Sequence, residues 1–205
     1  RVWDISKQTK GHIELFLESG LSTGRSAEAI GRDFRQLLYD PNKRFRRIRD
    51  EEGNLVLSQP MKNYNPGRGV YRSSRMNALR VASTETNMGY RMSDVERWKQ
   101  LDFVQGYEVK RSANAHPCVI CDSLKGKYPK GFVFPGWHPF CICYAVPIVM
   151  GHDDFADYLL SEKVQEADIV NSIPRNATQF FSKNTKYLEN SYIAKYNKVL
   201  LKDFL

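Results

Sequence analysis

The chain has 205 residues, of which 41% are hydrophobic, so it is long enough to bury a core without disulfide staples. It contains no run of eighteen apolar residues, which predicts that no segment spans a membrane and that no membrane is among its partners. The formal net charge of +8 is unevenly spread, because residues 1–150 carry 24 Lys and Arg against 15 Asp and Glu, whereas residues 151–205 carry 7 against 8. A basic body of this kind is typical of contact with polyanions or acidic proteins, and also of a merely solvated surface.

Apolar residues recur at helical spacing in three stretches of the chain. Residues 3–18 show a weak pattern, and a stronger one follows Ser26, a residue type that commonly caps helix N-termini. The stronger pattern ends before Pro41, because proline disfavours a helical conformation in the residue that precedes it. Residues 71–101 are the longest helical candidate, with a weak point at Gly89.

A dense run of arginines lies between these helices. Residues 43–57 are predicted to form a β-hairpin that turns near Gly53, and residues 58–69, rich in Pro, Gly and Asn, are predicted to form a loop. A planar guanidinium binds carboxylate or phosphate through paired hydrogen bonds, so the run is a candidate contact with acidic protein or DNA, and a solvated loop is the alternative. Four residues make up this candidate contact: Arg44, Arg46, Arg47 and Arg49.

Shorter elements are predicted in the second half of the chain. Residues 104–110 alternate as a strand does, and residues 143–150 are typical of a second strand. A short helix is expected after Gly151. Residues 171–185 are polar and predicted to form a loop, and residues 187–205 are predicted to form a helical or irregular tail.

All four cysteines of the chain lie close together in the sequence. Cys118 and Cys121 have the C-x-x-C spacing at which a tight turn lets two thiolates face one metal ion, and His138, Cys141 and Cys143 form a second cluster. Together they offer five candidates for the four places of a structural zinc site. A regular strand would put Cys141 and Cys143 on one face and leave His138 outside, whereas a turn would bring His138 in. Buried free thiols and disulfides are the alternatives to metal.

These patterns predict a mostly helical α+β protein in three parts. Residues 1–103 form a helical region that carries the basic hairpin and loop at 43–69. Residues 104–150 form a small β-rich unit stapled by zinc, and residues 151–205 form a tail that packs on this body or on a partner.

The cysteine segment also carries a family resemblance. The strings Cys118-Val-Ile-Cys121-Asp-Ser-Leu-Lys-Gly126 and His138-Pro-Phe-Cys141-Ile-Cys143 resemble the C-terminal signature of the phage Mu F-like minor head proteins, the head-morphogenesis family. Upstream, Arg80-Val-Ala-Ser-Thr84-Glu85 is similar to the family's Arg-x-x-x-Thr-Glu helix motif, and the order and separation of the two motifs match. Ser83 and Ile142 depart from the family pattern, because Arg is common at both places, and these losses of charge weaken the case for polyanion contact beside the motifs.

The resemblance implies a non-enzymatic protein, present in a few copies inside the procapsid or at its portal vertex, made in the host cytoplasm and kept in the virion. The implied partners are the portal protein and capsid proteins, with packaged DNA as a further candidate. Glu85 of the helix motif is expected to anchor the helix by pairing with Arg80 or Arg111 rather than to act as a general base. The family also includes chains with C-terminal toxin domains, and residues 151–205 match no toxin pattern.

A zinc-dependent deaminase is the competing hypothesis. Deaminases combine a His-x-Glu motif with Pro-Cys-x-x-Cys, in which one His and two Cys hold zinc and Glu moves protons. Here His12 and Glu14 would join Cys118 and Cys121. The two halves lie roughly a hundred residues apart, and the cluster that begins at His138 would stay unused, so the sequence favours a non-enzymatic protein.

Overall fold

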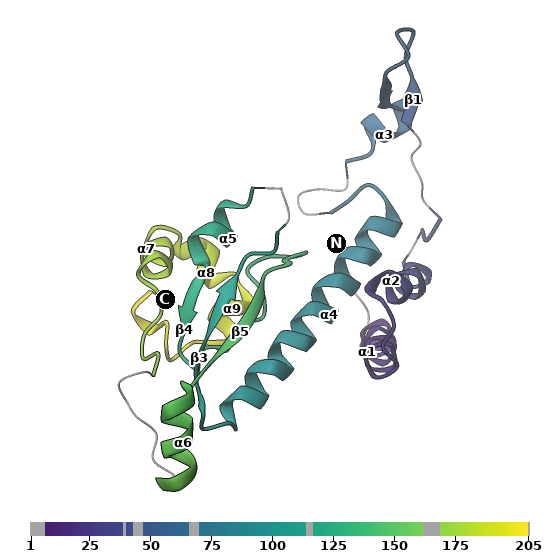
Figure 1. Ribbon diagram of the computed structural model, residues 1–205. Helices are drawn as coiled ribbons and strands as arrows, with labels where there is room; N and C mark the ends of the chain where they lie inside the picture. Colours follow the sequence, from purple (N-terminus) through teal and green to yellow (C-terminus); the bar gives the residue numbers. More distant parts are fainter. Residues whose placement is uncertain are drawn as a thin grey trace. The chain divides into compact units, whose positions relative to one another are not determined.

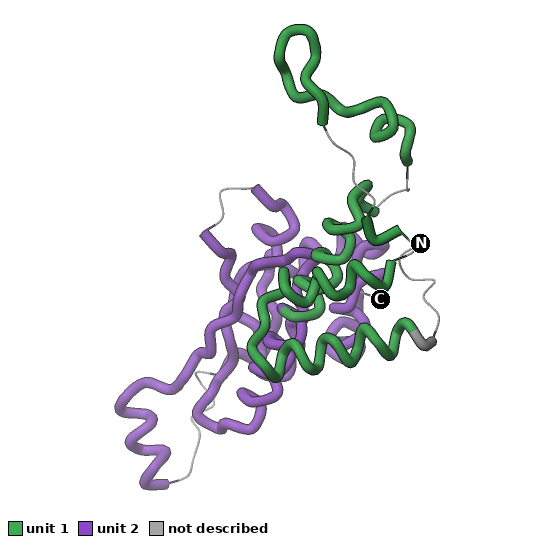
Figure 2. Tube along the Cα trace, turned by 90° about the vertical axis from the view of Figure 1, so that its right-hand side faces the viewer, with its two compact units in different colours: residues 1–86 green, residues 87–205 purple. Residues whose placement is uncertain are grey.

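The chain combines helices with two small sheets, which places it in the mixed α+β class. The computed structural model describes residues 7–38, 40–42, 47–65, 70–113, 117–161 and 169–204. The chain divides into two compact units, unit 1 with residues 1–86 and unit 2 with residues 87–205 (Figure 2). This division falls inside helix α4 (Ser74–Lys99), whereas the sequence placed a boundary at residue 103. None of the helices in the described ranges is long and apolar enough to cross a membrane.

Unit 1 is held together by a small core between α2 (Ala27–Gln36) and the first half of α4. Helix α2 begins where the sequence predicted, because the side chain of Ser26 accepts a hydrogen bond from the amide of Ala29 at 3.2 Å. A glycine lets the two helices approach closely, since a Cβ at Gly31 would lie 3.2 Å from the Cα of Leu79. The buried core residues are Ile30, Phe34, Ala78 and Ala82, and side chains of α1 (Lys7–Ser22) pack against them.

A β-hairpin also belongs to unit 1, and its prediction from the sequence is confirmed. Strands β1 (Arg47–Arg49) and β2 (Leu55–Leu57) pair in antiparallel fashion. The carboxylate of Asp50 organises the turn by accepting hydrogen bonds from the amides two and four residues later, at 3.1 Å and 2.8 Å. Gly53 completes the turn with a φ of +85°, a conformation that favours glycine. Helix α3 (Gln59–Asn63) follows, inside the stretch that was predicted to be a loop.

An antiparallel sheet of order β4–β3–β5 organises unit 2 (Figure 1). Its central strand β3 (Val104–Lys110) has the bounds that the alternation predicted. Strand β5 (Tyr144–Val149) lies within the second predicted strand. Strand β4 (Gly126–Tyr128) was not predicted, because three residues are too few to show an alternating pattern.

The C-terminal residues supply part of the same core. The helices of this region are α6 (His152–Ser161), α7 (Arg175–Lys183), α8 (Thr185–Glu189), α9 (Tyr192–Tyr196) and the 3-10 helix η2 (Lys202–Phe204). Helices α7, α8 and α9 gather beside the sheet and bury apolar side chains in one cluster with it (Figure 1). The prediction of a loop over residues 171–185 is therefore wrong, because Ala177 and Phe181, four residues apart, form the apolar face of α7 within a polar composition.

Candidate metal centre

The five side chains that the sequence nominated as metal ligands come together in unit 2. The Nε2 atom of His138 lies 3.3 Å from the Sγ of Cys118 and 3.2 Å from the Sγ of Cys121. The ligand atoms form two groups, each with all of its atoms within 4.8 Å of one another: Cys118, Cys121 and His138 in one, and Cys121, Cys141 and Cys143 in the other. Because Cys121 belongs to both groups, the five side chains form one cluster that can bind a metal ion, named here the Cys/His centre.

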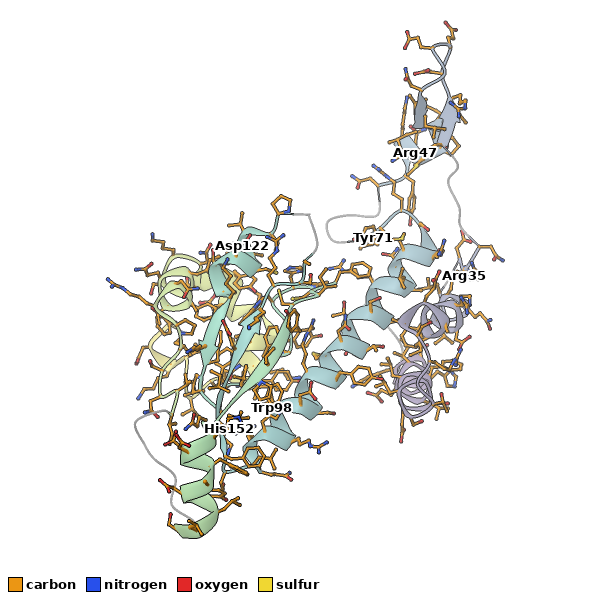
Figure 3. The ribbon with its side chains drawn as sticks, viewed as in Figure 1. Arg35, Arg47, Tyr71, Trp98, Asp122 and His152 are labelled. Carbon is orange, nitrogen blue, oxygen red and sulfur yellow. The ribbon has the colours of Figure 1, made fainter. Side chains whose placement is uncertain are left out.

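The first half of the Cys/His centre is shaped by the start of helix α5 (Val119–Leu124). Cys118 is the N-cap residue of this helix, and its Sγ accepts a hydrogen bond from the amide of Cys121 at 3.5 Å. The C-x-x-C spacing thereby places both sulfurs at the first helical turn. The helix is further fastened by an ion pair of 2.7 Å between Arg111 and Asp122, the residue labelled on α5 in Figure 3.

The second half of the Cys/His centre is a turn that precedes β5. The amide of Cys141 donates a hydrogen bond to the carbonyl of His138 at 3.0 Å, and Phe140 adopts the left-handed conformation with a φ of +60°. The Nδ1 atom of His138 lies 2.8 Å from the carbonyl oxygen of Pro139. A proton on Nδ1 satisfies that carbonyl and leaves the lone pair of Nε2 facing the sulfurs. Of the two arrangements that the sequence left open, the structure has the turn that brings His138 in.

Arg91 of α4 holds this turn in place, and sequence reasoning missed it. Its guanidinium donates hydrogen bonds to the carbonyl oxygens of Cys141 at 2.5 Å, of Cys143 at 2.8 Å and 3.1 Å, and of Pro135 at 3.2 Å. Gly136 has a φ of +117°, a conformation that favours glycine, and a Cβ there would lie 2.7 Å from the Nη1 atom of Arg91. Burial lowers the pKa of Arg91, and the negative charge of the neighbouring thiolates acts in the opposite direction. No pattern of spacing singles out one arginine among the many basic residues of a helix.

The Cys/His centre is largely enclosed. Cys121, Cys141 and Cys143 are 4%, 2% and 3% exposed, whereas Cys118 and His138 are half-buried. Aromatic side chains of the core surround the buried sulfurs. Such enclosure suits a structural metal site, because a catalytic site keeps one coordination position open to substrate.

Protons are unevenly shared among the buried thiols. Hydrogen bonds from Cys121 and Cys143 lower the pKa of Cys141 far below its ordinary value, although burial opposes the shift. The pKa of Cys121 is raised by its hydrogen bonds to Cys141 and Cys143 and by burial. A hydrogen bond from Cys121 lowers the pKa of Cys143, but its contact with Cys141 and its burial outweigh that effect and raise the pKa to about 12. A metal ion would replace the shared protons, because thiol ligands bind metal as thiolates.

The predicted helix motif lies on α4. The hydroxyl of Thr84 donates a hydrogen bond to the carbonyl of Arg80 at 2.7 Å, one turn earlier in the helix. Burial raises the pKa of Glu85, a half-buried residue. Arg111, one of its two predicted partners, forms its ion pair with Asp122.

The arginine run is described only in part. Arg47, labelled in Figure 3, and Arg49 lie exposed on β1, and Arg49 donates a hydrogen bond to the carbonyl of Gly53 at 2.6 Å. Arg44 and Arg46 lie outside the described residues. The run therefore stays a predicted contact surface.

The His-x-Glu residues of the deaminase hypothesis lie on α1 in unit 1, whereas its two cysteines lie in unit 2. His12 and Glu14 are exposed, and Glu14 lies 3.6 Å from Lys10, its neighbour one helical turn earlier. Within the described ranges, the metal-ligand group that contains both Cys118 and Cys121 takes its histidine from His138.

Comparisons of the chain with protein-family models, with curated proteins and with solved structures found no match. The resemblance to minor head proteins therefore stays a prediction. Function has to be argued from the residues of the two units.

Proposed function

We propose that the chain is a non-enzymatic minor head protein of a tailed phage, and that one structural zinc ion staples its unit 2. The observation that carries the zinc part is the gathering of a C-x-x-C pair and a His-x-x-Cys-x-Cys turn in one enclosed cluster. Thiolates and imidazoles are the ligands that zinc prefers in closed tetrahedral sites.

Four of the five donors are sufficient for zinc, and the hydrogen bonds favour one set. We infer the ligands Cys118, Cys121, His138 and Cys141. His138 faces the first two sulfurs, and hydrogen bonds from the side chains of Cys121 and Cys143 lower the pKa of Cys141 far below its ordinary value. Such bonds stabilise a thiolate. Cys143 is then a fifth donor beside the ion.

The ion would join parts of unit 2 that lie far apart in the sequence. Helix α5 leads into β4, whereas the turn over 138–143 leads into β5, and these two strands are the outer strands of the sheet. A metal bound to both parts adds its binding free energy to folding, because the unfolded chain does not hold the ligands together.

The head-protein part is supported by the placement of both motifs around one helix. Arg80, Thr84 and Glu85 stand on α4, and Arg91 of the same helix donates hydrogen bonds to the turn of the Cys/His centre. A continuous helix therefore links the two motifs on which the resemblance rests. The proposed partners are the portal protein and capsid proteins, with packaged DNA as a second candidate, and the proposed location is the virion.

Metal content tests the zinc part. Protein kept reduced throughout purification should hold about one zinc per chain, and the Cys118→Ser/Cys121→Ser double variant should lose it together with thermal stability. Cys141→Ser should lose zinc as well, whereas Cys143→Ser serves as the matched control and should keep it. Reduced protein without metal would contradict the staple, and zinc lost only in Cys143→Ser would exchange the roles of the two cysteines.

Incorporation into particles tests the head-protein part. Expressed with the portal and capsid proteins of a phage that encodes it, the chain should co-purify with procapsids, and omission of the portal protein should abolish this. A chain that stays out of procapsids although the portal is present would overturn the assignment. Glu14→Ala should leave incorporation into procapsids unchanged. If this variant instead lost the biological activity of the protein, the result would favour the deaminase hypothesis.

A further inference from the structure

A pocket in unit 1 is lined by more arginines than carboxylates. It lies between α2 and α4 and has a volume of about 260 Å³. Gly31 and Leu79 line it together with four charged side chains: Glu28, Arg32, Arg35 and Arg75. We name it the arginine pocket.

Helical spacing explains why these charges converge. Glu28, Arg32 and Arg35 recur at intervals of four and three along α2, and Arg75 precedes Leu79 by one turn on α4, so each set faces one side of its helix. The close approach of the two helices at Gly31 brings both sides to the same pocket.

The arginine pocket is incompletely neutralised. Arg75 forms an ion pair of 2.5 Å with Glu28, the only carboxylate among the lining residues. Asp33, the nearest acid along α2, is engaged by Arg25 at 2.6 Å. In the part of the chain that the structure describes, neither Arg32 nor Arg35 forms an ion pair.

One guanidinium also has a buried donor that nothing satisfies. The Nε atom of Arg35, labelled in Figure 3, is buried and has no hydrogen-bond partner among the described residues. An unsatisfied buried donor costs free energy, the more so when it is charged. This donor is closed to solvent-sized groups, so a bound anion would balance the charge of Arg35 rather than accept a hydrogen bond from its Nε atom.

The size of the pocket limits what it can take. At about 260 Å³, it is smaller than the usual site for a drug-sized ligand. Three guanidinium groups that approach from two helices suit a tetrahedral oxyanion, because each planar fork can bind two of its oxygens. We propose that the arginine pocket binds a phosphate group, either free phosphate or a phosphate of a nucleic-acid backbone. This site is independent of the zinc centre and of the head-protein assignment.

Titration of the full chain with inorganic phosphate tests the pocket. Amide resonances of Gly31 and Leu79 should shift saturably when phosphate replaces chloride at constant ionic strength. Arg32→Gln changes an exposed residue without disturbing the core and should weaken the apparent affinity about tenfold, the effect of losing a charged hydrogen bond. Arg97→Gln, the same substitution at an exposed position of α4 in unit 2, should leave the affinity unchanged.

A variant that should bind phosphate more tightly distinguishes an effect on binding from damage to the fold. Glu28→Gln removes the carboxylate that competes for Arg75, so it should tighten phosphate binding while Arg32→Gln weakens it. Damage to the fold cannot produce both signs. Shifts that grow linearly without saturation, or that change alike in both variants, would overturn the proposal.

Duplex DNA distinguishes the two sources of phosphate. If the pocket takes a backbone phosphate, Arg32→Gln should reduce the slope of log affinity against log salt by about one, and Arg97→Gln should not. Suppose that Arg32→Gln leaves this slope unchanged, while free phosphate binds more weakly to Arg32→Gln and more tightly to Glu28→Gln. The ligand is then free phosphate. DNA binding that is altered in Arg32→Gln without any saturable phosphate response would contradict the pocket as the site.

Discussion

Units 1 and 2 bury very different amounts of apolar surface. Among the described residues, the core of unit 1 consists of Ile30, Phe34, Ala78 and Ala82. The core of unit 2 draws on its sheet, on α4 and α5 and on the C-terminal helices, and it includes large aromatic side chains such as Tyr107, Tyr128, Phe132, Phe134 and Phe181. A small core contributes little stability, so unit 1 depends on close helix packing and capping, whereas unit 2 has aromatic packing and the Cys/His centre, which can bind a metal ion.

The two units also differ in how their charged side chains are used. In unit 2 the ionisable groups near the Cys/His centre are used internally, since Arg91 binds backbone carbonyls and Arg111 binds Asp122. In unit 1, Arg32 of the pocket and Arg47 and Arg49 of β1 are exposed. Unit 1 is therefore the better candidate for binding anionic partners.

The largest effect is expected from a core truncation in unit 2. Phe181→Ala should lower the free energy of unfolding by about 3–5 kcal/mol, because Phe181 is fully buried and its removal leaves a cavity. Urea unfolding followed by the fluorescence of Trp98 and Trp137 reports on this unit. Leu160→Ala is the control, since Leu160 is 88% exposed and its truncation should change stability by less than about 0.5 kcal/mol. Equal effects of the two substitutions would mean that α7 does not belong to the core.

A substitution of Arg91 tests whether metal binding at the Cys/His centre depends on the residues that surround the ligands. Arg91→Lys keeps the charge but cannot reproduce four hydrogen bonds to three carbonyl oxygens. Zinc affinity should fall about 10–100-fold, the usual consequence of losing a group that orients metal ligands. Competition with a chromogenic chelator measures this, and Arg97→Lys on the exposed side of α4 is the matched control. Unchanged affinity would show that the turn holds its shape without Arg91.

The same substitution, glycine to alanine, at two positions of unit 1 tests its close helix packing. Gly31→Ala places a Cβ 3.2 Å from the backbone of Leu79, so the helices must move apart at a cost of about 1–3 kcal/mol, less the gain in helix propensity of about 1 kcal/mol. Gly11→Ala on α1 meets nothing within 4 Å and should stabilise its helix by about 0.5–1 kcal/mol. Hydrogen exchange of peptides from α1 and α2 measures both changes. Stabilisation by both substitutions would show that α2 and α4 are not in close contact at Gly31.

Sequence patterns predicted those features that depend on local spacing. The cap at Ser26, the hairpin turn at Gly53 and the cysteine pair of α5 are each determined by neighbouring residues, and the structure has them. Helix α7 was missed because only Ala177 and Phe181 mark its buried face within a polar sequence. Arg91 was missed because its role depends on residues some fifty positions away in the sequence, such as Cys141. Such distant partners leave no local period from which they can be predicted.

The smallest effect is expected at Glu85, where burial and ion pairing predict opposite changes in stability for Glu85→Gln. Burial raises the pKa of Glu85 in the folded protein above its unfolded value, so folding favours the protonated form, and stability declines as the pH rises through the shifted pKa. Glu85→Gln removes this decline. It should therefore match the parent protein in acid and be slightly more stable at neutral pH, as measured by urea unfolding across the pH range. An ion pair with Arg80 would instead make Glu85→Gln the less stable protein at neutral pH, because a paired carboxylate has a lowered pKa. The sign of this difference decides whether the helix motif of α4 is anchored by charge, as the sequence predicted, or is a desolvated position held by packing.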